Sequence, residues 1–230
     1  MQIAQCHIDE TYINGWRAAQ INCPKALIPA PGQYLLAQTS PAADSPLPAP
    51  IYLAATSLNG FYAANPLPAA WTPGTSLALK GPLGRGFHLP HTARRVLLAS
   101  WSQTSGRVLS LLETCQRQGA EVALIADSAP EEIPLSVEVL PPAVLPEAAR
   151  WADYAALDMP REQIENLLAS PPLFDPLNLL SGYAQVLIET SVPCGGMAEC
   201  GVCAVSTKNG IRLACKDGPV FGLGELVLTT

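Results

Sequence analysis

Residues 194–221 read CGGMAECGVCAVSTKNGIRLACKDGPVF, and this stretch decides how the C-terminal part of the chain must fold. It contains four of the seven cysteines, which are Cys194, Cys200, Cys203 and Cys215. Three of them lie in one glycine-containing loop, and the fourth follows an eleven-residue gap. Because glycine has no Cβ, a glycine-containing backbone can approach a bound object closely. The spacing favours a site in which the four thiolates surround a metal or a cluster.

The spacing of these cysteines is close to that of a known cluster type. A [2Fe–2S] cluster takes four ligands, and thiolates supply the charge and softness that iron prefers. The plant-type arrangement is C-x4-C-x2-C with a distant fourth cysteine, whereas this chain has C-x5-C-x2-C-x11-C. We therefore predict an iron–sulfur cluster on these four residues. Two alternatives stay open: a structural zinc site, which usually needs two close cysteine pairs, and disulfides or free thiols.

Composition and charge exclude several classes of protein. The chain has 230 residues, of which 49% are hydrophobic and 14% charged, and its net charge is −6. The negative balance and the lack of a basic patch argue against nucleic-acid binding. No apolar run reaches the roughly 18 residues that span a membrane, and no signal peptide is recognisable. A cytoplasmic chain without disulfides is expected. The remaining cysteines, Cys6, Cys23 and Cys115, are expected in the core.

Three segments follow one another along the chain. Residues 1–92 contain short strands between proline and glycine turns, which predicts an antiparallel β-barrel. Residues 93–172 predict an α/β unit, with buried strands on either side of a helix that Ser105 caps and Gly119 ends. A second helix is expected at 160–169, capped by Asp158. Residues 171–182 suggest a linker, and residues 173–230 form the predicted cluster domain.

Taken together, the motifs resemble the electron-transfer subunit of the NAD-linked dihydroorotate dehydrogenases, in the ferredoxin–NADP reductase superfamily. CGGMAECGVCAV and LACKDGPVF are similar to the family's cluster loop and closing segment. APGQYLLA, 30–37, is similar to its PGQF strand, and GPLGRGF, 81–87, to its GPLGxGF loop. The resemblance implies an FAD-binding-like barrel at 1–92, an NAD-binding-like α/β domain at 93–172 and a [2Fe–2S] domain at 173–230.

The nucleotide-binding motifs of the family are altered in this chain. Its flavin signature, R-P-[FY]-S, corresponds to LPAPIYL at 47–53, with Ala49 at the arginine position and Tyr52 at the serine position. Loss of the guanidinium removes a charge-assisted contact to the FAD diphosphate, which leaves backbone contacts and stacking as the alternative. The glycine run near the dinucleotide is replaced by ASWSQTSG at 99–106, where Trp101 is expected to fill the space. NAD binding is therefore not expected, and Asp127 is interpreted as a turn residue.

These observations favour an iron–sulfur electron-transfer subunit that docks on a flavin-containing dehydrogenase, with the dihydroorotate dehydrogenase catalytic subunit as the implied partner. No Ser-His-Asp order, paired carboxylate or P-loop predicts catalysis by the chain alone. His7, His88 and His91 share no ligand spacing, and GPLGRGF is interpreted as a turn. Two other functions stay open: a non-redox assembly or regulatory subunit with a structural metal site, and a complete flavin reductase.

Overall fold

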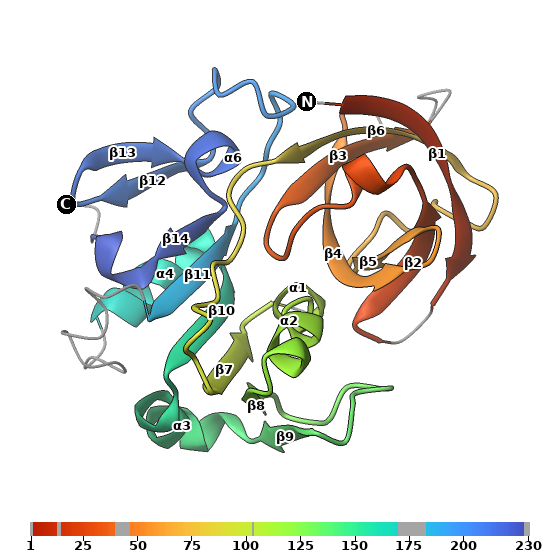
Figure 1. Cartoon of the computed structure of the whole chain (residues 1–230). Helices are drawn as coiled ribbons and strands as arrows, with labels where there is room; N and C mark the ends of the chain where they lie inside the picture. Colours follow the sequence, from red (N-terminus) through yellow and green to blue (C-terminus); the bar gives the residue numbers. More distant parts are fainter. Residues whose placement is uncertain (1, 13–14, 40–46, 103, 170–182, 228–230) are drawn as a thin grey trace.

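Six antiparallel strands form the sheet of the N-terminal part of the chain (Figure 1). The computed structural model describes residues 2–12, 15–39, 47–102, 104–169 and 183–227. The strands are β1 (Gln2–Thr11), β2 (Arg17–Asn22), β3 (Tyr34–Thr39), β4 (Ala49–Ser57), β5 (Gly60–Ala64) and β6 (Ser76–Leu83). They pair in the order β1-β2-β5-β4-β3-β6, and β6 pairs with β1, so the sheet closes on itself. Ile21, Leu35 and Phe61 are among the side chains of its buried core.

A second sheet is built mostly from parallel strands. Its order is β14-β11-β10-β7-β8-β9, and β14 alone runs antiparallel to its neighbour. The strands are β7 (Arg95–Ser100), β8 (Glu121–Ile125), β9 (Val137–Leu140), β10 (Tyr154–Pro160), β11 (Ala184–Glu189) and β14 (Val220–Gly222). Continuous buried runs in β7, β8 and β10 match a sheet that is covered on both faces. The predicted mixed α/β class with an antiparallel N-terminal sheet is confirmed.

The helix predicted between β7 and β8 is two short helices. These are α1 (Gly106–Leu109) and α2 (Leu112–Arg117), separated at Ser110. The Ser110 hydroxyl donates to the carbonyl of Arg107, three residues earlier, which offers the backbone a local alternative to helical bonding. Ser105 precedes α1 but makes no side-chain cap bond. Gly119 ends the second helix in a left-handed conformation, as predicted.

The role predicted for Asp158 is wrong. The helix that it was expected to cap, α4 (Arg161–Ala169), does exist. Asp158, however, lies inside β10 and is fully buried. Its carboxylate tolerates this burial because it pairs with a buried arginine. Asp158 is the one charged residue of the strand sequence YAALDMP. The sequence alone does not show which arginine pairs with this buried carboxylate.

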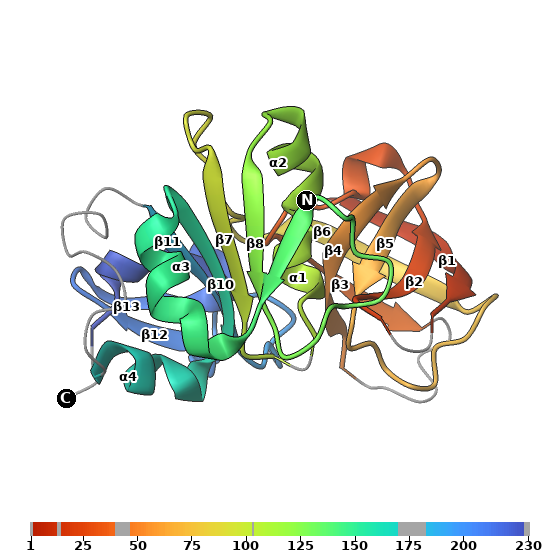
Figure 2. The ribbon, with the colours of Figure 1, turned by 90° about the horizontal axis from the view of Figure 1, so that it is seen from below.

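Helices cover both faces of the second sheet (Figure 2). Helices α1 and α2 lie on the face toward the N-terminal sheet, and α3 (Leu145–Trp151) and α4 lie on the opposite face. Cys115 is buried on the α2 side and Cys6 inside the N-terminal sheet, as predicted, while Cys23 is half-buried against the same core.

The predicted linker at 171–182 and the boundary near residue 172 lie outside the described residues. Strands β11 and β14 come from the predicted cluster segment, yet both pair within the second sheet. Within the described residues, no helix combines the length and the apolar character needed to cross a membrane.

A buried ion-pair network joins the two sheets. Arg107 of α1 donates from Nε to Asp158 Oδ2 at 2.9 Å and from Nη2 to Glu189 Oε2 at 2.7 Å. The side chains of Arg107 and Asp158 are 4% and 0% exposed. The guanidinium also lies 5.3 Å from the ring centroid of Tyr52 in β4. The cation of α1 therefore contacts β10, β11 and the N-terminal sheet at the same time.

We expect Arg107→Met to lower the free energy of unfolding by about 3 kcal/mol, because it leaves the carboxylate of Asp158 buried without its partner. Urea denaturation followed by circular dichroism measures this change. Arg95→Met is the matched control, because the Arg95–Asp153 pair is 47% and 30% exposed and such surface pairs contribute little. Equal losses in the two variants would contradict the assigned role of the network.

Candidate metal centre

The four cysteines predicted as ligands lie in the segment that connects β11 to β14 of the second sheet. Cys194 and Cys200 belong to the loop that follows β11, and Cys203 ends this loop. Strands β12 (Ala204–Thr207) and β13 (Gly210–Leu213) then form a hairpin. Its closing bond runs from the amide of Ala214 to the carbonyl of Cys203 at 2.9 Å. The hairpin therefore returns the chain beside Cys203 and places Cys215, on α6 (Ala214–Asp217), next to it.

The four thiols lie close to one another. Cys194 interacts with Cys200 and Cys215, and Cys215 also interacts with Cys203. The amide of Ala198 contacts the sulfurs of both Cys194 and Cys215. Within the described residues, no three His, Cys, Asp or Glu side chains gather closely enough to hold a single metal ion. The structure thus brings the four predicted residues into one region of the molecule.

The loop backbone wraps around the sulfur of Cys194. The amides of Glu199, Ala198 and Cys200, together with the Cys200 thiol, contact this sulfur and lower the pKa of Cys194 to about 6. Ala198 has a positive φ of 63°, which turns the backbone sharply at this point. Successive amides that converge in this way form a concave anion site. The loop is therefore shaped to hold negative charge at a sulfur atom.

The four thiols differ in burial. Cys203 and Cys215 are 1% and 3% exposed, whereas Cys194 is half-buried and Cys200 is exposed. Burial, followed by the contact with Cys203, raises the pKa of Cys215 to about 12. A metal that binds this pair must displace the protons, so binding would release protons and depend on pH. One edge of the site faces solvent and the other faces the core.

The N-terminal sheet holds the cysteine segment in place. The Tyr34 hydroxyl of β3 donates to the carbonyl of Cys215 at 2.8 Å, and Lys80 Nζ of β6 donates to the carbonyl of Gly195 at 3.4 Å. The amide of Arg85, in the GPLGRGF loop, donates to the carbonyl of Gly218. This loop is therefore more than a turn, because it binds the closing segment. Nothing in the sequence couples the two motifs, which lie far apart along the chain.

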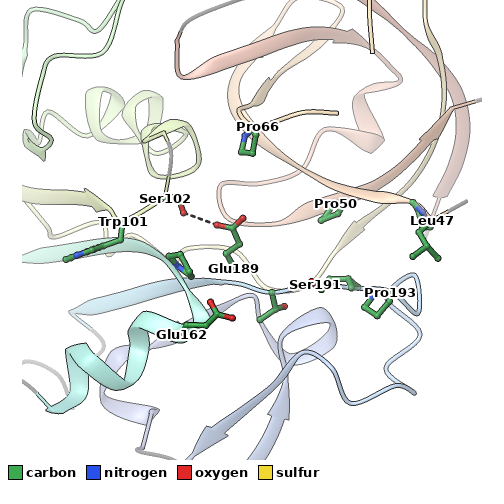
Figure 3. A pocket seen from close by; sticks show the side chains of 13 residues that line it. Leu47, Pro50, Pro66, Trp101, Ser102, Glu162, Glu189, Ser191 and Pro193 are labelled. Atoms are coloured by element: carbon green, nitrogen blue, oxygen red, sulfur yellow. Dashed lines mark hydrogen bonds between the residues drawn. The ribbon is translucent and has the colours of Figure 1, made fainter. Parts of the chain in front are cut away.

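A cavity of about 770 Å³ adjoins the start of the cysteine loop (Figure 3). Its walls include Trp101, Ser102, Glu162, Glu189 and several prolines. No lysine or arginine is found among its described lining residues. Arg107 lines an adjoining cavity of about 350 Å³, but its guanidinium is engaged by two carboxylates. The described lining residues therefore offer the diphosphate of FAD no free cationic side chain, the kind of donor that forms the strongest hydrogen bonds to phosphate.

Another cavity, of about 910 Å³, lies at the carboxyl ends of β7 and β8. Open α/β sheets bind nucleotides at such an edge. Trp101 lines this cavity without filling it, contrary to the expectation from the sequence. Asp127 and Glu131 supply carboxylates, and no described lining residue is a lysine or arginine. A dinucleotide phosphate would find no charged side-chain donor here.

Comparisons with known proteins relate the cysteine segment to one family. Residues 189–227 match the family model described as the iron–sulfur cluster binding domain of dihydroorotate dehydrogenase B. This range contains all four predicted ligands. Comparison with curated protein sequences gave no match.

Several solved structures resemble most of the chain. One is a NADH-dependent reduced ferredoxin–NADP oxidoreductase studied for flavin-based electron bifurcation, with a TM-score of 0.66 and 16% identity over 94% of this chain and 90% of that one. A ferredoxin reductase of carbazole 1,9a-dioxygenase, in its FAD apo form, matches with a TM-score of 0.52 and 15% identity, over 72% of this chain and 61% of that one. An intact type IV self-sufficient cytochrome P450 monooxygenase matches with a TM-score of 0.55 and 12% identity, over 83% of this chain and 28% of that one.

At these identities the structural matches show a similar fold and nothing more. The family match shows that residues 189–227 resemble an iron–sulfur cluster binding domain. Together they confirm the resemblance predicted from the sequence at two levels: residues 189–227 resemble the iron–sulfur cluster binding domain of dihydroorotate dehydrogenase B, and the fold of the chain resembles that of a ferredoxin–NADP oxidoreductase.

Proposed function

We propose that this chain is an iron–sulfur electron-transfer subunit in which Cys194, Cys200, Cys203 and Cys215 hold a [2Fe–2S] cluster. Its proposed partner is a flavin-containing dehydrogenase, the dihydroorotate dehydrogenase catalytic subunit of pyrimidine biosynthesis. The cluster would supply one-electron transfer between the flavin of that partner and another carrier. The match of residues 189–227 to an iron–sulfur domain supports the proposal.

The number and closeness of the thiols support the choice of cluster. Each iron of a four-cysteine [2Fe–2S] cluster takes two protein ligands, and the four cysteines of this chain lie in one region. A structural zinc ion also takes four donors, so metal analysis separates the two. The extra residue between Cys194 and Cys200 falls in the wrapped loop, in which Ala198 has a positive φ.

The surrounding residues would hold and orient the group. The amides of residues 198–200 face the sulfur of Cys194 and would stabilise negative charge there. The Cys203–Cys215 pair is shielded by the core. We propose 1–92 as the barrel domain, 93–172 as the α/β domain and 173–230 as the cluster domain, with the first two acting mainly as scaffold. Electrons would pass at the exposed edge near Cys200.

Anaerobically purified protein should be brown and contain about two irons and two sulfides per chain. Cys200→Ser is the sharpest single test, because this side chain is exposed and its loss leaves the core intact. We expect that variant to lose most of its iron while its circular dichroism spectrum remains that of the folded protein. Metal analysis, the visible spectrum and circular dichroism measure these outcomes.

Cys23→Ser serves as the control, since Cys23 lies outside the cysteine segment and is half-buried. It should keep the iron content of the unaltered protein. Colourless protein with stoichiometric zinc would refute the cluster and favour a structural metal site in an assembly subunit.

We also expect the chain alone to retain little flavin through purification and to leave NADH unoxidised, because no described residue that lines the two large cavities is a lysine or arginine. Heating the purified protein and measuring flavin fluorescence in the supernatant tests the first point, and titration with added FAD extends it. Released flavin, or absorbance bleaching on addition of NADH, would instead favour a complete flavin reductase.

Exposed apolar side chains beside Cys200 suit a docking edge. Met197 and Val202 flank this cysteine and are both exposed. Met197→Glu should slow reduction of the cluster by the partner at least severalfold while leaving its visible spectrum unchanged, because a charge there must be desolvated on docking. Leu58→Glu is the matched control, since Leu58 is an even more exposed apolar residue on the turn between β4 and β5. Stopped-flow measurements with the catalytic subunit decide between the two outcomes.

A further inference from the structure

We infer that the Tyr34 hydroxyl is a positioning group for the fourth cluster ligand, holding the backbone of Cys215 against the loop that carries the other three cysteines. This inference rests on the proposed function and adds to it a residue from the N-terminal sheet, far from the cysteines in sequence.

The hydroxyl contacts the ligand segment directly. It donates to the carbonyl of Cys215 at 2.8 Å, and Tyr34 is almost fully buried. A carbonyl in such a site needs a partner, because an unpaired buried acceptor is costly. The bond therefore fixes the main chain at the ligand residue itself.

The same hydroxyl also lies against the loop that carries Cys194. A Cβ added to Gly196 would stand 3.2 Å from the Tyr34 oxygen. Gly196 thus leaves room for the hydroxyl to lie between the loop and Cys215. One side-chain atom is in contact with both parts of the chain that supply thiolates.

Hydrogen bonds within the cysteine segment hold the residues that precede Cys215, whereas Tyr34 holds the carbonyl of Cys215 itself. The amide of Ala214 is tied to Cys203, and that of Leu213 is tied to the Asp217 carboxylate at 3.0 Å. These bonds shape the short α6 turn within the cysteine segment. Tyr34 connects that turn to the rigid barrel-like sheet, and a side chain on a strand positions a ligand more firmly than a loop does.

The hydroxyl can be removed without changing the ring. Phenylalanine has the ring of tyrosine and lacks only its oxygen, so Tyr34→Phe removes one hydrogen bond while keeping the ring that packs in the core.

Tyr34→Phe, in the iron-loaded protein, should release iron to a chelator about tenfold faster than the unaltered chain, which is the loss expected from one such bond. Its reduction potential should become more negative, because the freed carbonyl dipole leaves uncompensated negative charge beside a ligand. Anaerobic chelator kinetics and a dithionite titration followed in the visible spectrum measure both effects.

Tyr154→Phe is the matched control. Tyr154 is buried and its hydroxyl donates to Gln185 Oε1 at 2.7 Å, between β10 and β11. This variant should retain the unaltered iron-release rate and potential, and thermal unfolding of both variants should be cooperative. In metal-free protein, a maleimide should label Cys215 faster in Tyr34→Phe than in Tyr154→Phe, as read by peptide mass spectrometry.

Two outcomes separate the inference from the proposed function. If the unaltered protein holds iron and Tyr34→Phe matches Tyr154→Phe in release rate and potential, the inference is overturned alone. An unaltered protein that never holds iron overturns the proposed function and the inference with it.

Discussion

The arrangement of the molecule depends on one buried cation, the guanidinium of Arg107. Taking this charge out of water is costly, and it is tolerated because Asp158 and Glu189 both accept hydrogen bonds from it. Glu189 ends β11, and the chain continues from there into the loop of Cys194. The network therefore fixes where that loop leaves the sheet, relative to α1 and to Tyr52 of the N-terminal sheet.

A second set of contacts acts from the opposite side. The N-terminal sheet reaches the cysteine segment through Lys80, Tyr34 and the loop containing Arg85. The segment is thus held at its entry by the ion pairs of the α/β part and farther along by the barrel-like sheet. A redox centre benefits from such support, because its potential and stability depend on the residues behind its ligands.

Sequence reasoning selected the candidate ligands because their spacing is a local property of the chain, and residues 189–227 match an iron–sulfur domain. The α/β class and the N-terminal antiparallel sheet were also predictable, from buried apolar runs and from turns. The role of Asp158 was not, because its partner Arg107 lies fifty-one residues away in sequence. The contact of Arg85 with Gly218 was not predictable for the same reason. The sequence of a glycine-containing loop is the same whether the loop faces solvent or binds another segment.

The antiparallel edge strand β14 has a consequence for the cysteine segment as a whole. The segment leaves the sheet at the end of β11 and comes back as β14, which pairs with β11 itself. The amide of Ile188 and the carbonyl of Pro219 close its neck at 2.9 Å. An insertion whose two ends already touch adds little loop-closure cost to the framework. The cysteine segment is therefore a side loop that starts and ends at one edge of the sheet, and its buried residues share the core of that sheet.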